Sequence, residues 1–434
     1  MLKRILILIC ILSLVACNDK PQNTNPAPVK PGVEVLLDKH LDLLRGKRVG
    51  LITNTTGVDT KLNSTITLFR NNPDINLVAL YGPEHGVRGD AQAGEHVSYY
   101  FDKEYQLPVY SLYGQGGDVS TQGLNNIDAR MRSYDTQHTG KTVDPAILKS
   151  VDVMVFDMQD VGTRIYTYIS TMAYAMQACA DAGIPFIVLD RPNPIGGTVM
   201  EGPILQYPEY SSFIGLYPIP LRHGMTMGEL ARLFNEKFLN NKVKLYVIPM
   251  ENWQRDEWYD QTSLTWVKPS PNLPTANATI VYPGQVLLEG TNLSEGRGTT
   301  QPFELFGAPW IDGIALTKQL NALHLPGVIF RETWFTPTFS KFQNQACQGA
   351  QLFVTDRNAF RPVASTLAIL SVIWQEYGNK LEFHNDYFDH VMGTSSVREA
   401  LERGDSYQSI VAGMQAGLRD FAVLRAPFLL YPAR

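Results

Sequence analysis

Residues 151–190 read VDVMVFDMQDVGTRIYTYISTMAYAMQACADAGIPFIVLD, and this stretch decides the fold. Its two ends, Val151–Met158 and Pro185–Asp190, are continuous apolar runs, which are typical of strands buried on both faces. Between them, apolar side chains recur at helical spacings of three and four at Ile165, Ile169, Met172, Met176 and Cys179. Gly183 and Pro185 then end the helical pattern. A strand, a helix and a strand in this order predict two parallel neighbours with the helix packed on the sheet.

Similar apolar runs flank this unit and extend the predicted sheet. They are Arg48–Thr53, Asn76–Tyr81, Val109–Tyr113 and Lys244–Met250. Before the last of these, Thr226 and Glu229 have the spacing of a capping box at the start of a helix. We therefore expect an α/β fold in which a mostly parallel sheet is covered by helices on both faces.

The alternation of apolar runs and helical segments ends after about Glu251. Trp, Pro, Gly and Asn become frequent, and clear units return only as a strand near Gln351–Thr355 and a helix over Pro362–Tyr377. We predict a catalytic domain at 33–250 and a smaller mixed α+β domain at 251–434. Within the first, about 114–145 is polar and glycine-bearing, which indicates a surface insertion.

The N-terminus has the pattern of an export signal. Residues 1–16 combine a basic start with a short apolar run, and Leu14-Val15-Ala16-Cys17 resembles a bacterial lipobox. We expect a lipoprotein signal peptide, with Cys17 as the lipidated first residue of the mature protein and 17–32 as a proline-rich tether. The alternative is an ordinary secretory signal in which the cysteine is incidental.

Composition narrows the classes of function. The net charge of −5, from 37 basic and 42 acidic side chains, is not the footprint of a nucleic-acid-binding protein. Cys179 and Cys347 remain after processing, so a disulfide framework is not expected, although a single bridge is possible. Neither a dinucleotide fingerprint nor a phosphate loop is present, and we predict no cofactor. His85, His96 and His223 lack the spacing of a zinc site, and we predict no metal.

Polar, turn-forming segments follow four of the predicted strands. Ligands of open parallel sheets bind outside the carboxyl ends of the strands, so these segments are expected to converge on one rim. Their candidate residues are Asn54, Glu84, His85, Arg88, Asp157, Asp160, Arg164, Arg191 and Asn193.

Glu84 is the sharpest single candidate. It lies between Pro83 and His85 on a glycine-flanked turn, where partial burial would favour the protonated form that a general acid needs. The alternative is that Glu84 caps a turn or pairs with Arg88. Asp157 lies nearer the end of its strand and is expected to anchor a neighbouring loop. Asp160 lies further from the strand, where contact with a ligand is the expectation.

A second polar cluster spans residues 288–300, LEGTNLSEGRGTT. Its glycines permit backbone shapes that bring Glu289, Asn292, Glu295 and Arg297 together. We predict that it forms the opposite wall of an active-site cleft between the two domains; the alternative is an irregular connection. The Gly-x-Ser-x-Gly motif of a serine hydrolase is absent. The candidate residues are carboxylates, arginines and asparagines, which are the groups that carbohydrate chemistry uses: one acid protonates the leaving oxygen, and a second carboxylate acts as base or nucleophile.

Several long motifs resemble those of the NamZ-type exo-β-N-acetylmuramidases. They include ITNTTGVD (52–59), YGPEHGVRGDAQAGE (81–95), VFDMQDVGTRIYTYISTMAYAM (155–176), LDRPNPIGG (189–197), YPIPLRHGMTMGELARLFN (217–235), PSPNLPT (269–275) and LEGTNLSEGRGTTQPFELFGAPWID (288–312). The resemblance implies a Rossmann-like domain followed by a smaller domain. It also implies release of terminal N-acetylmuramic acid from the non-reducing end of peptidoglycan fragments.

The resemblance also suggests roles for the candidates. Glu84 matches a characteristic glutamate and is the predicted general acid, with Glu295 or Asp160 as its partner. Substrate-assisted attack by the acetamido oxygen, oriented by Asp157 or Asp160, is a further possibility. The lactyl carboxylate needs a cation, and the pool is Arg164, Arg191, Arg222 and Arg297. The remaining predicted substrate contacts are Asn54, His85, Arg88, Asn193, His223 and Asn292.

Two other functions fit the same residues. One is a non-catalytic lipoprotein that binds muramyl saccharides, and the other is a metal-assisted cell-wall amidase or esterase. In each case the predicted partners are peptidoglycan-derived saccharides and, through Cys17, a membrane of the cell envelope. The oligomeric state is not indicated.

Overall fold

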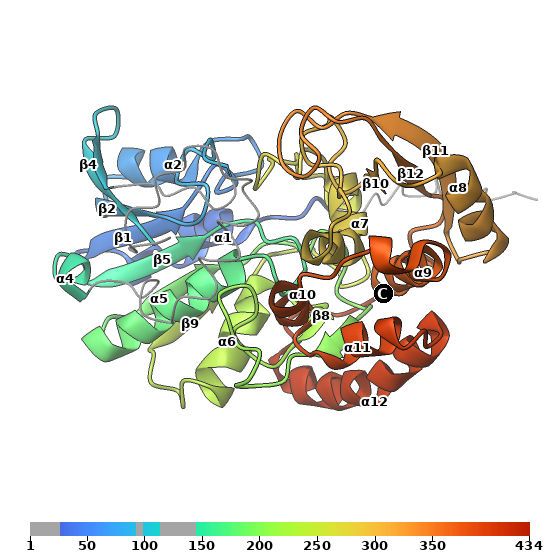
Figure 1. Cartoon of the computed structure of the whole chain (residues 1–434). Coiled ribbons are helices and arrows are strands. Elements are labelled where there is room, and N and C mark those ends of the chain that lie inside the picture. Colours follow the sequence, from blue (N-terminus) through green and yellow to red (C-terminus); the bar gives the residue numbers. More distant parts are fainter. Residues whose placement is uncertain (1–26, 93–98, 113–144) are drawn as a thin grey trace, which may run out of the picture.

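The structure, a computed structural model, describes residues 27–92, 99–112 and 145–434. The predicted signal peptide, Cys17 and almost all of the predicted insertion at 114–145 lie outside these residues. Figure 1 shows a larger part, built on a central sheet, beside a smaller part of helices and a short sheet. The predicted α/β fold class is confirmed.

The larger part contains a seven-stranded sheet in the order β3-β4-β2-β1-β5-β6-β9. The strands are β1 (Arg48–Thr53), β2 (Asn76–Gly82), β3 (Tyr100–Asp102), β4 (Leu107–Ser111), β5 (Val153–Asp157), β6 (Phe186–Leu189) and β9 (Leu245–Ile248). All pairings are parallel except that of the edge strand β3 with β4. The six predicted strands are confirmed, while β3 was not predicted.

Each face of this sheet packs against its own set of helices. Along β5, Val153 and Val155 join a core with α1 (Gly32–Lys39) and α2 (Thr65–Asn71). The alternate residues Met154 and Phe156 join a second core with α5 (Tyr168–Ala182) and α6 (Met227–Lys237). Because neighbouring side chains of a strand point to opposite faces, a strand covered on both faces is apolar throughout.

The helix ends follow the predicted signals. Gly183 takes a φ of +69° at the end of α5, a conformation that glycine adopts without a steric penalty. Thr226 and Glu229 form both hydrogen bonds of a capping box at the start of α6. Cys179 is buried on the apolar face of α5, and burial raises the pKa of its thiol to about 12, so it packs in the core as an unreactive thiol.

The smaller part is built on an antiparallel sheet in the order β10-β12-β11. Its strands are β10 (Leu305–Ala308), β11 (Val328–Phe335) and β12 (Cys347–Val354), and its helices are α7 (Ala276–Gln285), α8 (Gly313–Ala322), α9 (Pro362–Tyr377), α10 (Asn385–Met392), α11 (Ser396–Glu402) and α12 (Tyr407–Arg425). The predicted helix over Pro362–Tyr377 is α9, and the predicted strand near Gln351–Thr355 is the end of β12. Helix α8 packs on this sheet, and α9 packs against α7, α8 and α12.

Shorter elements complete the described chain. They are α4 (Pro145–Leu148), the ribbon of β7 (Glu201–Ile204) and β8 (Pro220–Arg222), and the 3₁₀ helices η1 (Leu41–Leu43), η2 (Tyr259–Gln261), η3 (Val286–Gly290), η4 (Gly378–Lys380) and η5 (Ala426–Phe428). Among the described residues, every helix is too short or too polar to cross a membrane.

Both ends of the described chain pack against the larger part. Near the C-terminus, the Tyr431 hydroxyl donates to Asp190, just after β6. At the other end, Val29 is buried against Met250 and Tyr431. The predicted tether extends to residue 32, but its last residues belong to the folded body. Although the segment is rich in proline, Val29 buries its apolar side chain against the larger part.

Candidate active site

Glu84 and His85 lie in the loop after β2, at the carboxyl edge of the sheet. Both side chains are buried, and the Thr167 hydroxyl donates to Oε2 of Glu84 at 2.6 Å. His85 has a φ of +72°, which is unusual for a residue with a Cβ atom. Its Nδ1 lies 2.8 Å from the carbonyl oxygen of Ala91, which only accepts hydrogen bonds, so Nδ1 carries a proton. Backbone and hydrogen bonds therefore fix both side chains.

The opposite wall is formed by Glu289, Arg297 and Tyr387. Oε1 of Glu289 accepts from Nε and Nη2 of Arg297 at 3.1 and 2.6 Å. Oε2 of the same carboxylate accepts from the Tyr387 hydroxyl of α10 at 2.8 Å. Donors on both oxygens stabilise the ionised form of this carboxylate.

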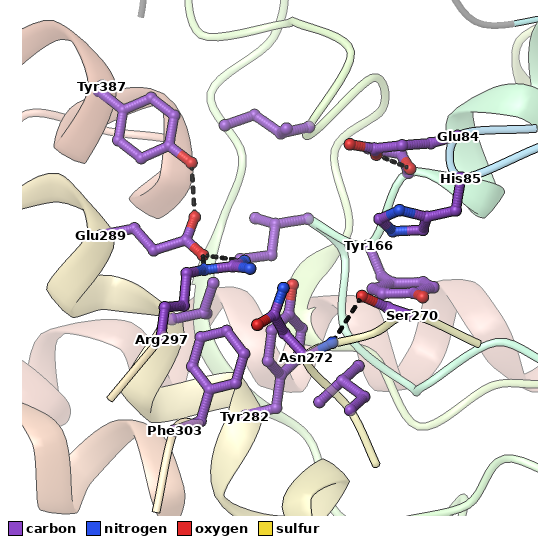
Figure 2. Close-up of a pocket in the computed structure, with 15 residues that line it drawn as sticks. Glu84, His85, Tyr166, Ser270, Asn272, Tyr282, Glu289, Arg297, Phe303 and Tyr387 are labelled. Carbon is purple, nitrogen blue, oxygen red and sulfur yellow. Dashed lines mark hydrogen bonds and ion pairs between the residues drawn. The ribbon is translucent and has the colours of Figure 1, made fainter. Parts of the chain in front are cut away.

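These two walls enclose one pocket, shown in Figure 2 with Glu84 and His85 on one side and Glu289 and Arg297 on the other. The pocket has about 460 Å³ of space between protein atoms, including its open mouth. Its remaining lining combines polar and apolar side chains: Ile165, Tyr166, Thr167, Ile214, Ser270, Asn272, Leu273, Tyr282, Val286 and Phe303. A pocket with a few convergent polar groups on an apolar lining is the usual form of a small-molecule site.

Glu295, the predicted partner of Glu84, lies behind this wall. It is 1% exposed and forms ion pairs with Lys341 at 3.0 Å and with Arg297 at 3.3 Å. Burial lowers the pKa of Lys341, an effect that the neighbouring Glu295 opposes. Because Glu295 does not line the pocket whereas Glu289 does, the geometry favours Glu289 as the second carboxylate.

Asp157 and Arg191 form a buried, bidentate ion pair, with N–O distances of 2.6 and 2.9 Å. Asp157 also accepts from the Thr65 hydroxyl, so it ties the β5 end to α2, as expected of an anchoring residue. The Asn54 amide donates to the Tyr168 hydroxyl at 2.6 Å. These three predicted substrate contacts are engaged with protein atoms outside the pocket lining.

Asp160 and His223 form a second buried pair close to the same rim. Oδ2 of Asp160 accepts from the backbone of Gly162 and lies 3.6 Å from Nε2 of His223. Neither side chain lines the pocket, so the predicted catalytic role of Asp160 has no geometric support here.

The arginines proposed for the lactyl carboxylate divide into two groups. Arg297 lines the pocket. Arg164 is fully buried and donates to the carbonyl oxygens of Pro203, Ile219 and Val391, and burial lowers its pKa to about 9. Arg222 pairs with Glu201 across the β7–β8 ribbon at 3.1 Å. Among the four, Arg297 is therefore the one placed to meet a ligand in this pocket.

The other predicted contacts also have structural roles. Arg88 pairs with Asp102 at 2.7 Å and with Glu104, so the alternative that it pairs with Glu84 is not seen. The amides of Asn193 and Asn292 donate to the backbone carbonyls of Met225 and Lys380.

Of the predicted site residues, the structure brings Glu84, His85 and Arg297 together in the pocket. Sequence reasoning did not select Tyr166, Ser270, Asn272, Glu289 or Tyr387. Glu289 stood in the second polar cluster, and Ser270 and Asn272 stood in the PSPNLPT motif. Tyr387 carried no local signal. Over the described ranges, no group of three or more His, Cys, Asp or Glu side chains is arranged to hold a metal ion.

Known proteins resemble this chain in sequence and in fold. The chain is 48% identical over 424 residues to a peptidoglycan β-N-acetylmuramidase NamZ of Bacillus subtilis strain 168, covering 96% of each chain. Its structure resembles a crystal structure of a DUF1343 family protein from Bacteroides fragilis NCTC 9343, with a TM-score of 0.81, 37% identity and coverage of 93% of this chain and 99% of that one. A second DUF1343 protein of that organism has a TM-score of 0.72 and 29% identity, covering 94% and 100%.

Two family models together cover most of the chain. The N-terminal model of the exo-β-N-acetylmuramidase NamZ matches residues 49–141 and 130–277, and the C-terminal model matches 280–431. The pocket lies where these two matched regions meet, since Glu84 and Asn272 belong to the first and Glu289 and Tyr387 to the second. The chain belongs to the NamZ family of exo-β-N-acetylmuramidases.

Proposed function

We propose that the chain is a glycoside hydrolase that releases terminal N-acetylmuramic acid from the non-reducing end of peptidoglycan fragments. Family membership along nearly the whole chain supports this activity. The structural observation that carries it is the pocket in which Glu84 on one wall faces the Glu289–Arg297 pair on the other. Two carboxylates on opposite walls of one pocket are the machinery that glycoside hydrolysis needs.

Glu84 acts as the general acid in this proposal. Its burial disfavours the charged carboxylate, and the fixed turn at His85 presents it to the pocket. A protonated Glu84 delivers its proton to the glycosidic oxygen as the bond from the anomeric carbon to the leaving sugar breaks, and a water molecule supplies the oxygen that the anomeric carbon gains in the hydrolysed product.

Glu289 supplies the second carboxylate. Arg297 and Tyr387 hold it ionised and fix its orientation, so its negative charge stabilises the oxocarbenium-like sugar in the transition state. We assign this role to Glu289 in place of Glu295, because Glu295 is enclosed by Lys341 and Arg297.

The test uses purified protein and two disaccharides that differ in which sugar is at the non-reducing end. We expect free N-acetylmuramic acid from the disaccharide in which the muramyl residue is terminal, and no cleavage when N-acetylglucosamine is terminal. Products are separated by liquid chromatography. Binding of the muramyl disaccharide without release of either sugar would instead identify a non-catalytic binder and refute the proposal.

We also propose that the mature protein is anchored in the cell envelope through a lipid on Cys17. The lipobox-like Leu14-Val15-Ala16-Cys17 and the proline-rich segment after it support this placement, which agrees with a cell-wall substrate. Metabolic labelling with a palmitate analogue is expected to label the wild-type chain and to leave Cys17→Ala unlabelled. Equal labelling of the two would refute the anchor.

A further inference from the structure

Asn272 presents a buried amide to the pocket floor. The side chain is 4% exposed, and its Nδ2 has no hydrogen-bond partner among the residues that the structure describes. Figure 2 shows Asn272 between the two walls, with Arg297 on one side and Ser270 and Tyr166 on the other. Its backbone N–H donates to the Ser270 hydroxyl at 3.3 Å, which holds the turn that carries the amide.

Tyr166 adds a second donor to the same pocket. Its hydroxyl is buried and interacts with the neighbouring Tyr168 hydroxyl, but no described residue meets the full geometry of a hydrogen bond to it. The ring packs edge-on against Tyr168 and Tyr282, with centroid distances of 4.7 and 6.0 Å, so its direction is fixed. Burial, with the neighbouring Tyr168 and Tyr282, raises the pKa of Tyr166 well above its ordinary value, so the hydroxyl keeps its proton.

Buried donors without acceptors are costly and uncommon in folded proteins. Each costs about 1–3 kcal/mol unless a partner is supplied. Because both residues line the pocket, the partner that fits these donors is a ligand group that accepts hydrogen bonds. A carbonyl oxygen has two lone pairs and meets this requirement.

The chemistry of the floor favours a neutral acceptor over an anion. Asn272, Tyr166 and Ser270 carry no charge, so none of the three is a counter-ion for a carboxylate. The charged groups of the pocket lie on its walls, where Arg297 is placed to meet an anionic substituent. Apolar side chains of Ile214 and Leu273 line the same pocket and suit a methyl group.

We infer that Asn272 and Tyr166 bind the carbonyl oxygen of the 2-acetamido group of the substrate, which makes Asn272 a specificity-determining residue. The inference rests on the proposed muramidase function. It predicts that the enzyme recognises the acetamido group through the floor and the lactyl group elsewhere, so that the two preferences are separable by mutation.

The experiment measures kcat/KM on three chromogenic glycosides. One is the N-acetylmuramide, one carries a hydroxyl in place of the acetamido group, and one lacks the lactyl group. Their ratios define an acetamido preference and a lactyl preference. We expect Asn272→Ala to lower the acetamido preference about 10- to 100-fold, the effect of losing a buried hydrogen bond, and to change the lactyl preference less than about twofold.

Three further variants extend this test: two remove the proposed donors, and one is a control. Asn272→Asp keeps the shape of the side chain but removes its donors, and we expect the same loss of acetamido preference. Tyr166→Phe is expected to lower the same preference. Asn277→Ala is the matched control, since Asn277 is exposed and lies outside this pocket, and we expect both preferences unchanged. Thermal unfolding of each variant shows that it is folded.

The inference is overturned if Asn272→Ala and Asn272→Asp keep the acetamido preference, or if the lactyl preference falls by as much. Failure of the proposed function looks different, because wild-type protein then cleaves none of the glycosides. Calorimetry with N-acetylmuramic acid and its 2-hydroxy analogue then decides the inference. Weaker binding of the N-acetyl sugar alone by Asn272→Ala supports it, and equal effects on both sugars overturn it.

Discussion

Replacing Thr167 by valine removes the hydroxyl that donates to Glu84 at 2.6 Å while keeping the shape of the side chain. A hydrogen bond to an ionised group contributes about 1.5–3 kcal/mol, and it favours the ionised carboxylate. A neutral carboxyl also accepts this bond, at about 1 kcal/mol, so only the difference of about 0.5–2 kcal/mol counts. At about 1.4 kcal/mol per pH unit, the loss lets Glu84 keep its proton to a pH about 0.5 to 1.5 units higher. A general acid is active when protonated, so the alkaline limb of the kcat/KM profile is expected to move upward by that amount.

The assay is the pH dependence of kcat/KM on a muramyl disaccharide, compared between wild-type protein and Thr167→Val. Thr171→Val is the matched control. Thr171 lies one helical turn further along α5 and donates to the Thr167 carbonyl, so its loss removes a buried hydroxyl without removing a partner of Glu84. An alkaline limb that stays in place in Thr167→Val, or that moves equally in Thr171→Val, would refute the assignment of Glu84 as the general acid.

Four further substitutions test the site and the residues that support it. Glu289→Gln and Glu295→Gln each break a buried ion pair and are expected to lower the free energy of unfolding by about 3 kcal/mol. Only Glu289→Gln should also lower kcat/KM of the folded protein, by about 100-fold. Equal losses of activity in the two variants would contradict the assignment of Glu289 as the second carboxylate. Arg164→Met removes the guanidinium that donates to three buried carbonyl oxygens, of which only that of Ile219 keeps another donor, the Leu205 N–H, and should cost about 3 kcal/mol in urea unfolding. A cost below about 1 kcal/mol would contradict this role. Burial raises the pKa of Asp190 to about 6, so the folded protein holds a proton that the unfolded chain has lost, and stability should fall from about pH 4 to about pH 6 and then level off. Asp190→Asn should flatten this slope in urea unfolding, and an identical slope in both proteins would contradict the shift.

The parallel sheet was predictable because burial on both faces leaves a strong local signal. Val153–Asp157 is apolar up to its last residue, and the helix after it ends at a glycine. The short edge strand β3 carries no such signal, since three residues do not establish a pattern. The ribbon of β7 and β8 was missed because its pairing is set by contacts between distant segments, such as the Glu201–Arg222 ion pair.

Only the part of the site that lies directly after a strand of the parallel sheet was predictable. The rule that ligands bind at the carboxyl ends of parallel strands located Glu84 and His85. The same rule also selected Arg164 and Asp157, because a sequence does not show which polar groups are satisfied by one another in the folded protein. Tyr387 lies 98 residues after Glu289, the carboxylate to which it donates, so this contact depends on tertiary packing.

The central claim is that Glu84 protonates the leaving group, and leaving-group chemistry tests it most directly. The measurement is kcat/KM of Glu84→Gln on two muramides, one with a sugar as leaving group and one with dinitrophenol, which leaves without protonation. We predict a loss of about 100-fold or more on the sugar substrate and a loss of less than about tenfold on the dinitrophenyl substrate. Equal losses on both substrates would contradict the account.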